Sequence, residues 1–130
     1  MAIKEHLQAA NIAVGAVALN GVYDEPPTHP PFPYALIGEF RSERNDLLDI
    51  VREEHTGEIH VYTREPERSY CDQFCAGIAA ALHRAELTVA ECAVIATLVE
   101  SYYVIEDPQS EPRTRQYHGI VAVRVLTRPV

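Results

Sequence analysis

The sequence predicts an α+β fold, with helices packed on a four-stranded, mainly antiparallel sheet in the order α, β, β, α, β, β. Two segments, 2–19 and 69–85, repeat apolar residues at steps of three and four, as one face of a helix does. Four others are short and apolar, alternate in polarity, or are rich in β-branched and aromatic residues, which favours strands. These four segments are 34–40, 57–63, 92–105 and 117–127.

Length and composition indicate one domain covering residues 1–130. The chain is 47% hydrophobic and 23% charged, which is ordinary for a globular protein. At 130 residues, roughly two thirds of the unfolded surface can be buried, so one core is enough.

The first predicted helix covers residues 2 to about 19. Gly15 costs about 1 kcal/mol in a helix interior and could divide it, and Asn20-Gly21 is a good C-terminal stop. Because Asn-Gly is also a strong hairpin signal, a strand pair across Leu19 to Val22 is the alternative. The apolar stripe consists of Ile3, Leu7, Ala10, Val14 and Val17.

Residues 25–33 hold five of the nine prolines and predict a stiff surface connection. Strand 34–40 follows it. Residues 41–56 are then densely charged, and such a long excursion inside a compact domain is usually functional. This segment carries either a helical turn or the extended arms of a hairpin.

Strand 57–63 alternates in polarity and so buries one face. The following helix, 69–85, begins with Ser69 and Asp72 in an arrangement like a capping box. Its apolar stripe consists of Cys71, Phe74, Cys75, Ile78, Leu82 and Ala85. Strands 92–105 and 117–127 form a natural antiparallel pair across a polar connection, 106–116.

Catalytic, cofactor and metal sites are not expected. Cys71 and Cys75 are four residues apart on a helix and could reach one ion, but they share the stripe with Phe74, which favours buried, reduced thiols. No glycine-rich phosphate loop is present. None of the six histidines falls in a metal or nucleophile motif.

The net charge of −8 disfavours static binding to DNA phosphate. A negative surface does suit a passage that DNA must slide through without sticking. Since no apolar run reaches 18 residues, we expect no membrane segment. Polar residues interrupt residues 1–10 where a signal peptide needs an unbroken apolar stretch, so we expect synthesis and folding in a cytoplasm.

Four passages in order resemble a known family. They are Gly21 to Asp24 with Pro33 to Gly38, Ile59 to Arg64, the small-residue helix, and Arg115 to Gly119 leading into Val121 to Thr127. Together they are similar to the tail-completion, or tail-terminator, proteins of long-tailed phages and gene transfer agents. Each passage alone is weak, so order and spacing carry the resemblance.

The resemblance implies a structural protein of the virion tail at the head–tail junction, made in the host cytoplasm. Its copies would form a ring, usually of six subunits, that caps the finished tail tube and offers its other face to the head connector. DNA would pass through the bore without sequence-specific binding.

Candidate interface residues come from physical reasoning alone. Arginines in polar loops are expected to contact carboxylates at the rim of subunit contacts, and the apolar final hairpin and the sheet edges are expected to meet a neighbour. The candidates for subunit or axial contacts are Arg41, Arg44, Asp46, Asp49, Arg113, Arg115, Ile120 and Val121. The charged segment 41–56 is expected either to reach an axial neighbour or to be an ordinary solvated loop. Two alternatives remain: a head-side connector protein, and a small ferredoxin-like enzyme or ligand-binding domain.

Overall fold

The computed structural model describes residues 2–14, 17–25, 28, 30–44, 46, 48, 51–64, 68–87, 92–106 and 116–129. These residues form two helices and seven strands. In chain order the elements are α1 (Ala2–Ala10), β1 (Ala13–Val14), β2 (Val17–Ala18), β3 (Val22–Tyr23), β4 (Tyr34–Arg44), β5 (Glu53–Thr63), α2 (Arg68–Leu82), β6 (Cys92–Glu106) and β7 (Tyr117–Pro129).

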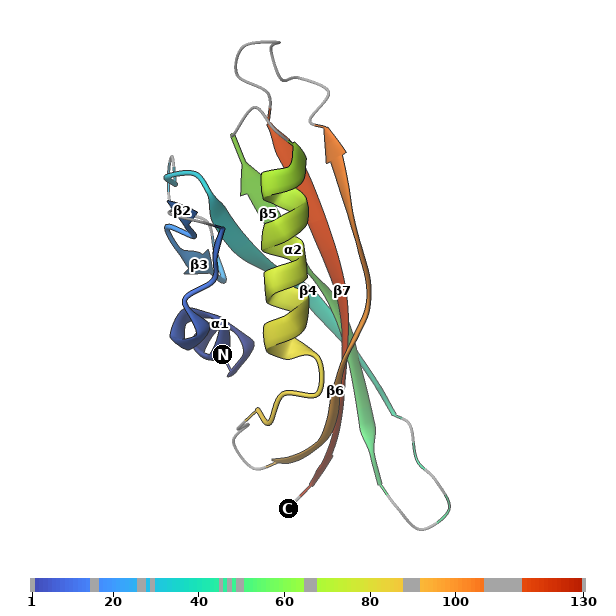
Figure 1. Ribbon diagram of the computed structural model, residues 1–130. Coiled ribbons are helices and arrows are strands. Elements are labelled where there is room, and N and C mark those ends of the chain that lie inside the picture. The colour runs from blue at the N-terminus through green and yellow to red at the C-terminus, as the bar shows by residue number, and fades with distance from the viewer. Residues whose placement is uncertain are drawn as a thin grey trace.

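The main sheet has the strand order β3-β4-β5-β7-β6 (Figure 1). All pairs are antiparallel except β3–β4, in which Val22 and Tyr23 run parallel to Ala35 and Leu36. The α+β class is confirmed, and the four predicted strands are present as β4, β5, β6 and β7. The prediction of a four-stranded sheet is corrected to five, because a two-residue strand such as β3 shows no periodicity in the sequence.

Helix α2 covers one face of this sheet and forms most of the core with it (Figure 1). The predicted stripe is confirmed as far as Leu82, since Cys71, Phe74, Cys75, Ile78 and Leu82 are all fully buried. Ala85, its last predicted member, lies beyond the end of the helix and is only partly buried. Beneath the helix, β5 and β7 contribute alternate residues that are also buried.

Helix α2 and strand β7 approach each other very closely at Gly119. A Cβ atom on Gly119 would clash with the Cys75 sulfur and lie 3.1 Å from the Cys71 sulfur. Glycine is therefore needed here for space. The helix ends at Leu82, a little before the predicted end at 85, and Arg84 takes a left-handed φ of 61°.

Helix α1 ends at Ala10, so the prediction of a helix reaching about Leu19 is wrong. Asn11 adopts a left-handed φ of 51°, which stops the helix, as asparagine often does after a last turn. The chain then forms the small β1–β2 pair, in which Ala13 pairs with Ala18 and Val14 with Val17. A hairpin does exist here, but it lies before the Asn20-Gly21 step on which the alternative prediction was based.

Strands β4 and β5 continue well beyond the part of the sheet that α2 covers (Figure 1). In this extension, which we call the arm, residues 41–44 pair with residues 53–56. The prediction of extended hairpin arms for 41–56 is thereby confirmed over these residues. The charged sequence is held in strands because β7 pairs with the other side of β5, placing Glu53 opposite Thr127 and Thr56 opposite Arg124.

The helices formed by the described residues are too short or too polar to cross a membrane.

Candidate assembly interface

One face of the sheet carries no helix in the described part of the chain, and we call it the uncovered face. Successive residues of a strand point to opposite faces. On β5 and β7, the residues that face α2 are mostly buried, whereas their neighbours are mostly half-exposed. The uncovered face is formed at its centre by Glu54, Thr56, Glu58, His60 and Tyr62 of β5 and by His118, Ile120, Ala122, Arg124 and Leu126 of β7.

Aromatic and imidazole rings stack at one end of the uncovered face. The ring centroids of Tyr34 and Tyr62 lie 5.0 Å apart, and those of Tyr62 and His118 lie 4.5 Å apart. His118 Nε2 is 2.7 Å from His60 Nδ1, so one imidazole donates a hydrogen bond to the other. Burial and the neighbouring Tyr62 raise the pKa of Tyr34, so its phenol stays neutral at physiological pH.

This ring stack continues into an apolar patch on β6. Tyr103 lies opposite Ile120, and Ile105 lies opposite His118. The side chains of Tyr103 and Ile105 remain 53% and 44% exposed. Large apolar side chains that gather on one surface are typical of a protein contact.

The middle of the uncovered face is charged, and its central arginine is held by carboxylates. Arg124 Nη1 lies 3.4 Å from Glu54 Oε1, and Arg124 Nε lies 3.1 Å from Glu100 Oε1. Glu58 adds a further acid to the same face. The guanidinium of Arg124 is therefore neutralised within its own chain.

The outer edge of β6 is partly closed by the α2 region. Arg68 donates a hydrogen bond of 2.9 Å to the carbonyl of Val104, and the N–H of Arg84 donates one of 2.6 Å to the carbonyl of Thr97. The N–H of Val99 donates to His83 Nδ1 at 3.1 Å. These contacts occupy backbone groups that an edge strand would otherwise offer to another strand.

A chain of hydrogen bonds crosses the arm on the face opposite the uncovered one. Ser42 Oγ lies 2.6 Å from His55 Nδ1, and His55 Nε2 lies 2.9 Å from Thr127 Oγ1. A carboxylate oxygen of Glu53 lies 3.7 Å from His55 Nε2. These hydrogen bonds tie three strands together. They differ from a Ser-His-Asp triad, because a threonine hydroxyl, and not a carboxylate, is hydrogen-bonded to the second ring nitrogen of the histidine.

The thiols of Cys71 and Cys75 lie together in the core. Both side chains are fully buried, and all three cysteines of the chain are free. The hydrogen bond with Cys71 and burial both raise the pKa of Cys75, which keeps it a neutral thiol. Among the described residues, no three His, Cys, Asp or Glu side chains are grouped to hold a metal ion.

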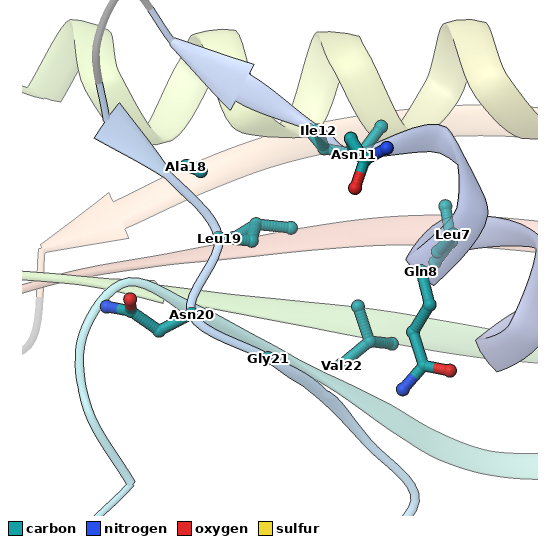
Figure 2. A pocket seen from close by; sticks show the side chains of 9 residues that line it. All are labelled: Leu7, Gln8, Asn11, Ile12, Ala18, Leu19, Asn20, Gly21 and Val22. Carbon is teal, nitrogen blue, oxygen red and sulfur yellow. The ribbon is translucent and has the colours of Figure 1, made fainter.

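A hollow of about 270 Å³ lies between α1, β2 and β3 (Figure 2). In Figure 2 the side chains of Ile12, Leu19 and Val22 come from different segments and face a common space. Its lining consists of Leu7, Gln8, Asn11, Ile12, Ala18, Leu19, Asn20, Gly21 and Val22. None of these side chains is charged.

The sequence matches the model of the family described as tail completion protein gp17 over residues 2–128. The chain belongs to this family. It is therefore a tail completion protein, a structural protein of phage-type tails, as the sequence resemblance predicted.

A solved structure shares the fold of this tail completion protein. It is a chain of the "Virion of native gene transfer agent (GTA) particle", with a TM-score of 0.79 and 17% sequence identity. The alignment covers 98% of this chain and 92% of the other. No curated protein matches the sequence.

The structure places three of the predicted interface residues of this tail completion protein together on the arm. Arg41 and Arg44 are exposed and pair with Glu43 at 2.5 Å and with Asp46 at 2.9 Å. Asp46 also accepts a hydrogen bond from the N–H of Arg52 at 3.2 Å. The carboxylates that pair with these arginines thus come from the same chain.

Ile120 and Val121 lie on opposite faces of β7. Ile120 is on the uncovered face, where it is 8% exposed, whereas Val121 is 0% exposed beneath α2. Val121 is therefore a core residue, and Ile120, although it lies on the uncovered face, is also nearly buried. Asp49, Arg113 and Arg115 lie outside the described residues.

The sequence alone does not show that Tyr34, Tyr62, His60 and His118 form one ring stack. The alternation of Glu58, His60 and Tyr62 already assigns them to one strand face. What the sequence lacks is the register of β5 against β7, which places His118 opposite Tyr62.

Proposed function

We propose that copies of this tail completion protein assemble into a ring, most simply a hexamer, that caps the finished tail tube and joins it to the head connector. In this proposal the protein resides at the head–tail junction of the virion after synthesis in the host cytoplasm. Support comes from the family match and from a fold shared with a chain of a gene transfer agent virion.

The one-sided sheet is the observation that carries the proposal. An antiparallel sheet that packs a helix on one face can leave its other face in water or present it to a partner. This face has polar and acidic side chains along β5, and its central Arg124 is neutralised by Glu54 and Glu100. A surface of this kind suits the wall of a bore, because it repels DNA phosphates weakly and does not grip them.

Subunits of such a ring must overcome their own repulsion. Each copy carries a net charge of −8, so six copies carry −48. Contacts between them are expected to be apolar at the centre and polar at the rim. Tyr103 and Ile105 supply apolar surface beside the nearly buried Ile120. Asp46 and the arginines of the arm, together with Asp49, Arg113 and Arg115, are the proposed rim residues.

The closed stretches of the β6 edge favour contact through side chains over simple strand addition. At Thr97, Val99 and Val104, the outward backbone groups already have partners from the α2 region. This refines the expectation that a neighbour satisfies the hydrogen-bonding groups of the sheet edges.

Replacement of Arg113 and Arg115 by Glu is expected to weaken assembly without unfolding the monomer. The mass of the oligomer in solution measures the effect.

Termination also requires two different ring faces, since a ring that offered tube-like surfaces on both sides would continue the tail. The tube protein that belongs to the same particle provides the test. The purified chain should bind the ends of preformed tubes and stop their growth, as seen by electron microscopy. Unaltered tube growth would contradict the capping role, and binding to the connector protein alone would favour the head-side alternative.

A further inference from the structure

The tip of the arm presents aliphatic side chains to solvent. Leu48 is 99% exposed and has a left-handed φ of 51°, and Val51 is 46% exposed. Exposed single leucines are common. A leucine that stands fully exposed at the end of a paired, charged extension is nevertheless well placed to enter a hollow on another molecule.

The hollow between α1, β2 and β3 can receive such a side chain. Its volume of about 270 Å³ is ample for one aliphatic group. Its apolar lining consists of Leu7, Ile12, Ala18, Leu19 and Val22, and amide side chains surround it (Figure 2). Leu7 and Val22 are nearly buried at its floor, whereas Ile12 and Leu19 are only partly buried. Because none of its side chains is charged, a second chain with a net charge of −8 can approach it closely.

A chain cannot fill its own hollow with its own arm. The hollow lies beside β3, which pairs with Ala35 and Leu36 near the start of β4. The arm lies at the other end of β4, at residues 41–44, and Leu48 follows it. Nine residue steps along the strand lead from Ala35 to Arg44, which corresponds to roughly 30 Å. In Figure 1 the arm and α1 accordingly lie at opposite sides of the molecule.

We propose that Leu48 at the arm tip of one copy inserts into the hollow of the next copy around the ring. This inference rests on the ring of the proposed function and deepens it by naming one contact. The arm and the hollow are different surfaces on opposite sides of one chain. A contact between two such surfaces is head-to-tail, which is the kind of contact that repeats around a ring.

Cross-linking between two introduced cysteines tests the contact directly. Leu48→Cys is combined with Gln8→Cys at the rim of the hollow, in a Cys92→Ser background. Cys71 and Cys75 are fully buried and can remain. With a short bismaleimide reagent, the double variant should give a ladder of covalent oligomers on a denaturing gel. Each single variant should give no more than dimers.

The result also separates this contact from the ring itself. A ring without a ladder would overturn the arm-to-hollow contact and leave the proposed function standing. A wild-type chain that forms no ring would overturn both.

A second pair of variants avoids chemical cross-linking. Leu48→Asp places a charge where an apolar group should be buried and should raise the concentration for half-assembly at least tenfold. Leu48→Met keeps an apolar side chain and should assemble like the wild type. Since Leu48 is exposed, both variants should retain the wild-type circular dichroism spectrum.

Unchanged assembly of Leu48→Asp would overturn the contact. So would an intact Leu48→Asp ring that no longer stops tube growth, because the arm would then bind the tube protein instead of a second copy.

Discussion

The two faces of the central strands β5 and β7 have different surroundings, although successive residues of the same strand belong to them in turn. Val61 and Gly119 face α2 and are buried, whereas Tyr62 and His118, one position away, lie half-exposed on the uncovered face. The first set holds the fold together. The second set contributes less to folding and remains available for assembly, so substitutions on the two faces should have separable effects.

Phe74→Ala is expected to give the largest loss of stability. Phe74 is fully buried on α2 at the centre of the covered face. Its removal leaves a cavity and should lower the free energy of unfolding by about 3 to 5 kcal/mol. Chemical denaturation of the monomer measures this value. The exposed neighbour Gln73→Ala is the matched control and should change it by no more than about 0.5 kcal/mol.

Gly119→Ala should have the next largest effect, because the added methyl group meets the Cys75 sulfur. Overpacking of this kind costs about 1 to 3 kcal/mol. The double variant Gly119→Ala with Cys75→Ala should recover part of that loss, since removal of the sulfur makes room. Additive losses in a double-mutant cycle would show that close packing is not the reason for glycine.

His118→Ala tests the uncovered face at the position next to Gly119. It removes a ring stack with Tyr62 and a hydrogen bond with His60, both half-exposed. The expected loss of unfolding free energy is about 0.5 to 1.5 kcal/mol. A loss as large as that of Phe74→Ala would mean that the uncovered face is part of the folding core, and the comparison between the two faces would fail.

Glu54→Gln combined with Glu100→Gln should change stability least. Both carboxylates are partly exposed, and exposed ion pairs contribute about 0 to 1 kcal/mol. The substitutions release Arg124 and reduce the negative charge of this face. The assembled protein should then retain DNA more strongly at low salt, measured by filter binding, whereas the wild type should not. Equal retention would argue against this face as the bore wall.

The long elements could be predicted from the sequence because they carry a period. The apolar stripe of α2 and the β-branched composition of β6 and β7 identify them without any partner. Helix α1 was predicted too long because Val14 and Val17 continue its spacing, although they belong to strands. Asn11 ends the helix in a left-handed conformation. Asparagine adopts this conformation only in some settings, so its presence alone does not predict the stop.

The features that could not be predicted depend on contacts between segments that are distant in the sequence. Strand β3 exists only because β4 offers it an edge, and the arm remains extended because β7 pairs with β5 along its length. The ring stack and the ion pairs of Arg124 likewise require the strand register. The sequence could therefore predict that the protein has an assembly surface, but it identified only some of the residues that form it.

The mass of the purified protein in solution, combined with negative-stain imaging, is the most direct test of whether its copies assemble into a ring. We expect a closed ring with a mass equal to a whole number of 14.5 kDa chains, six in the simplest case. A protein that stays monomeric or dimeric at all concentrations, with no ring-shaped particles even when tube ends are present, would contradict it.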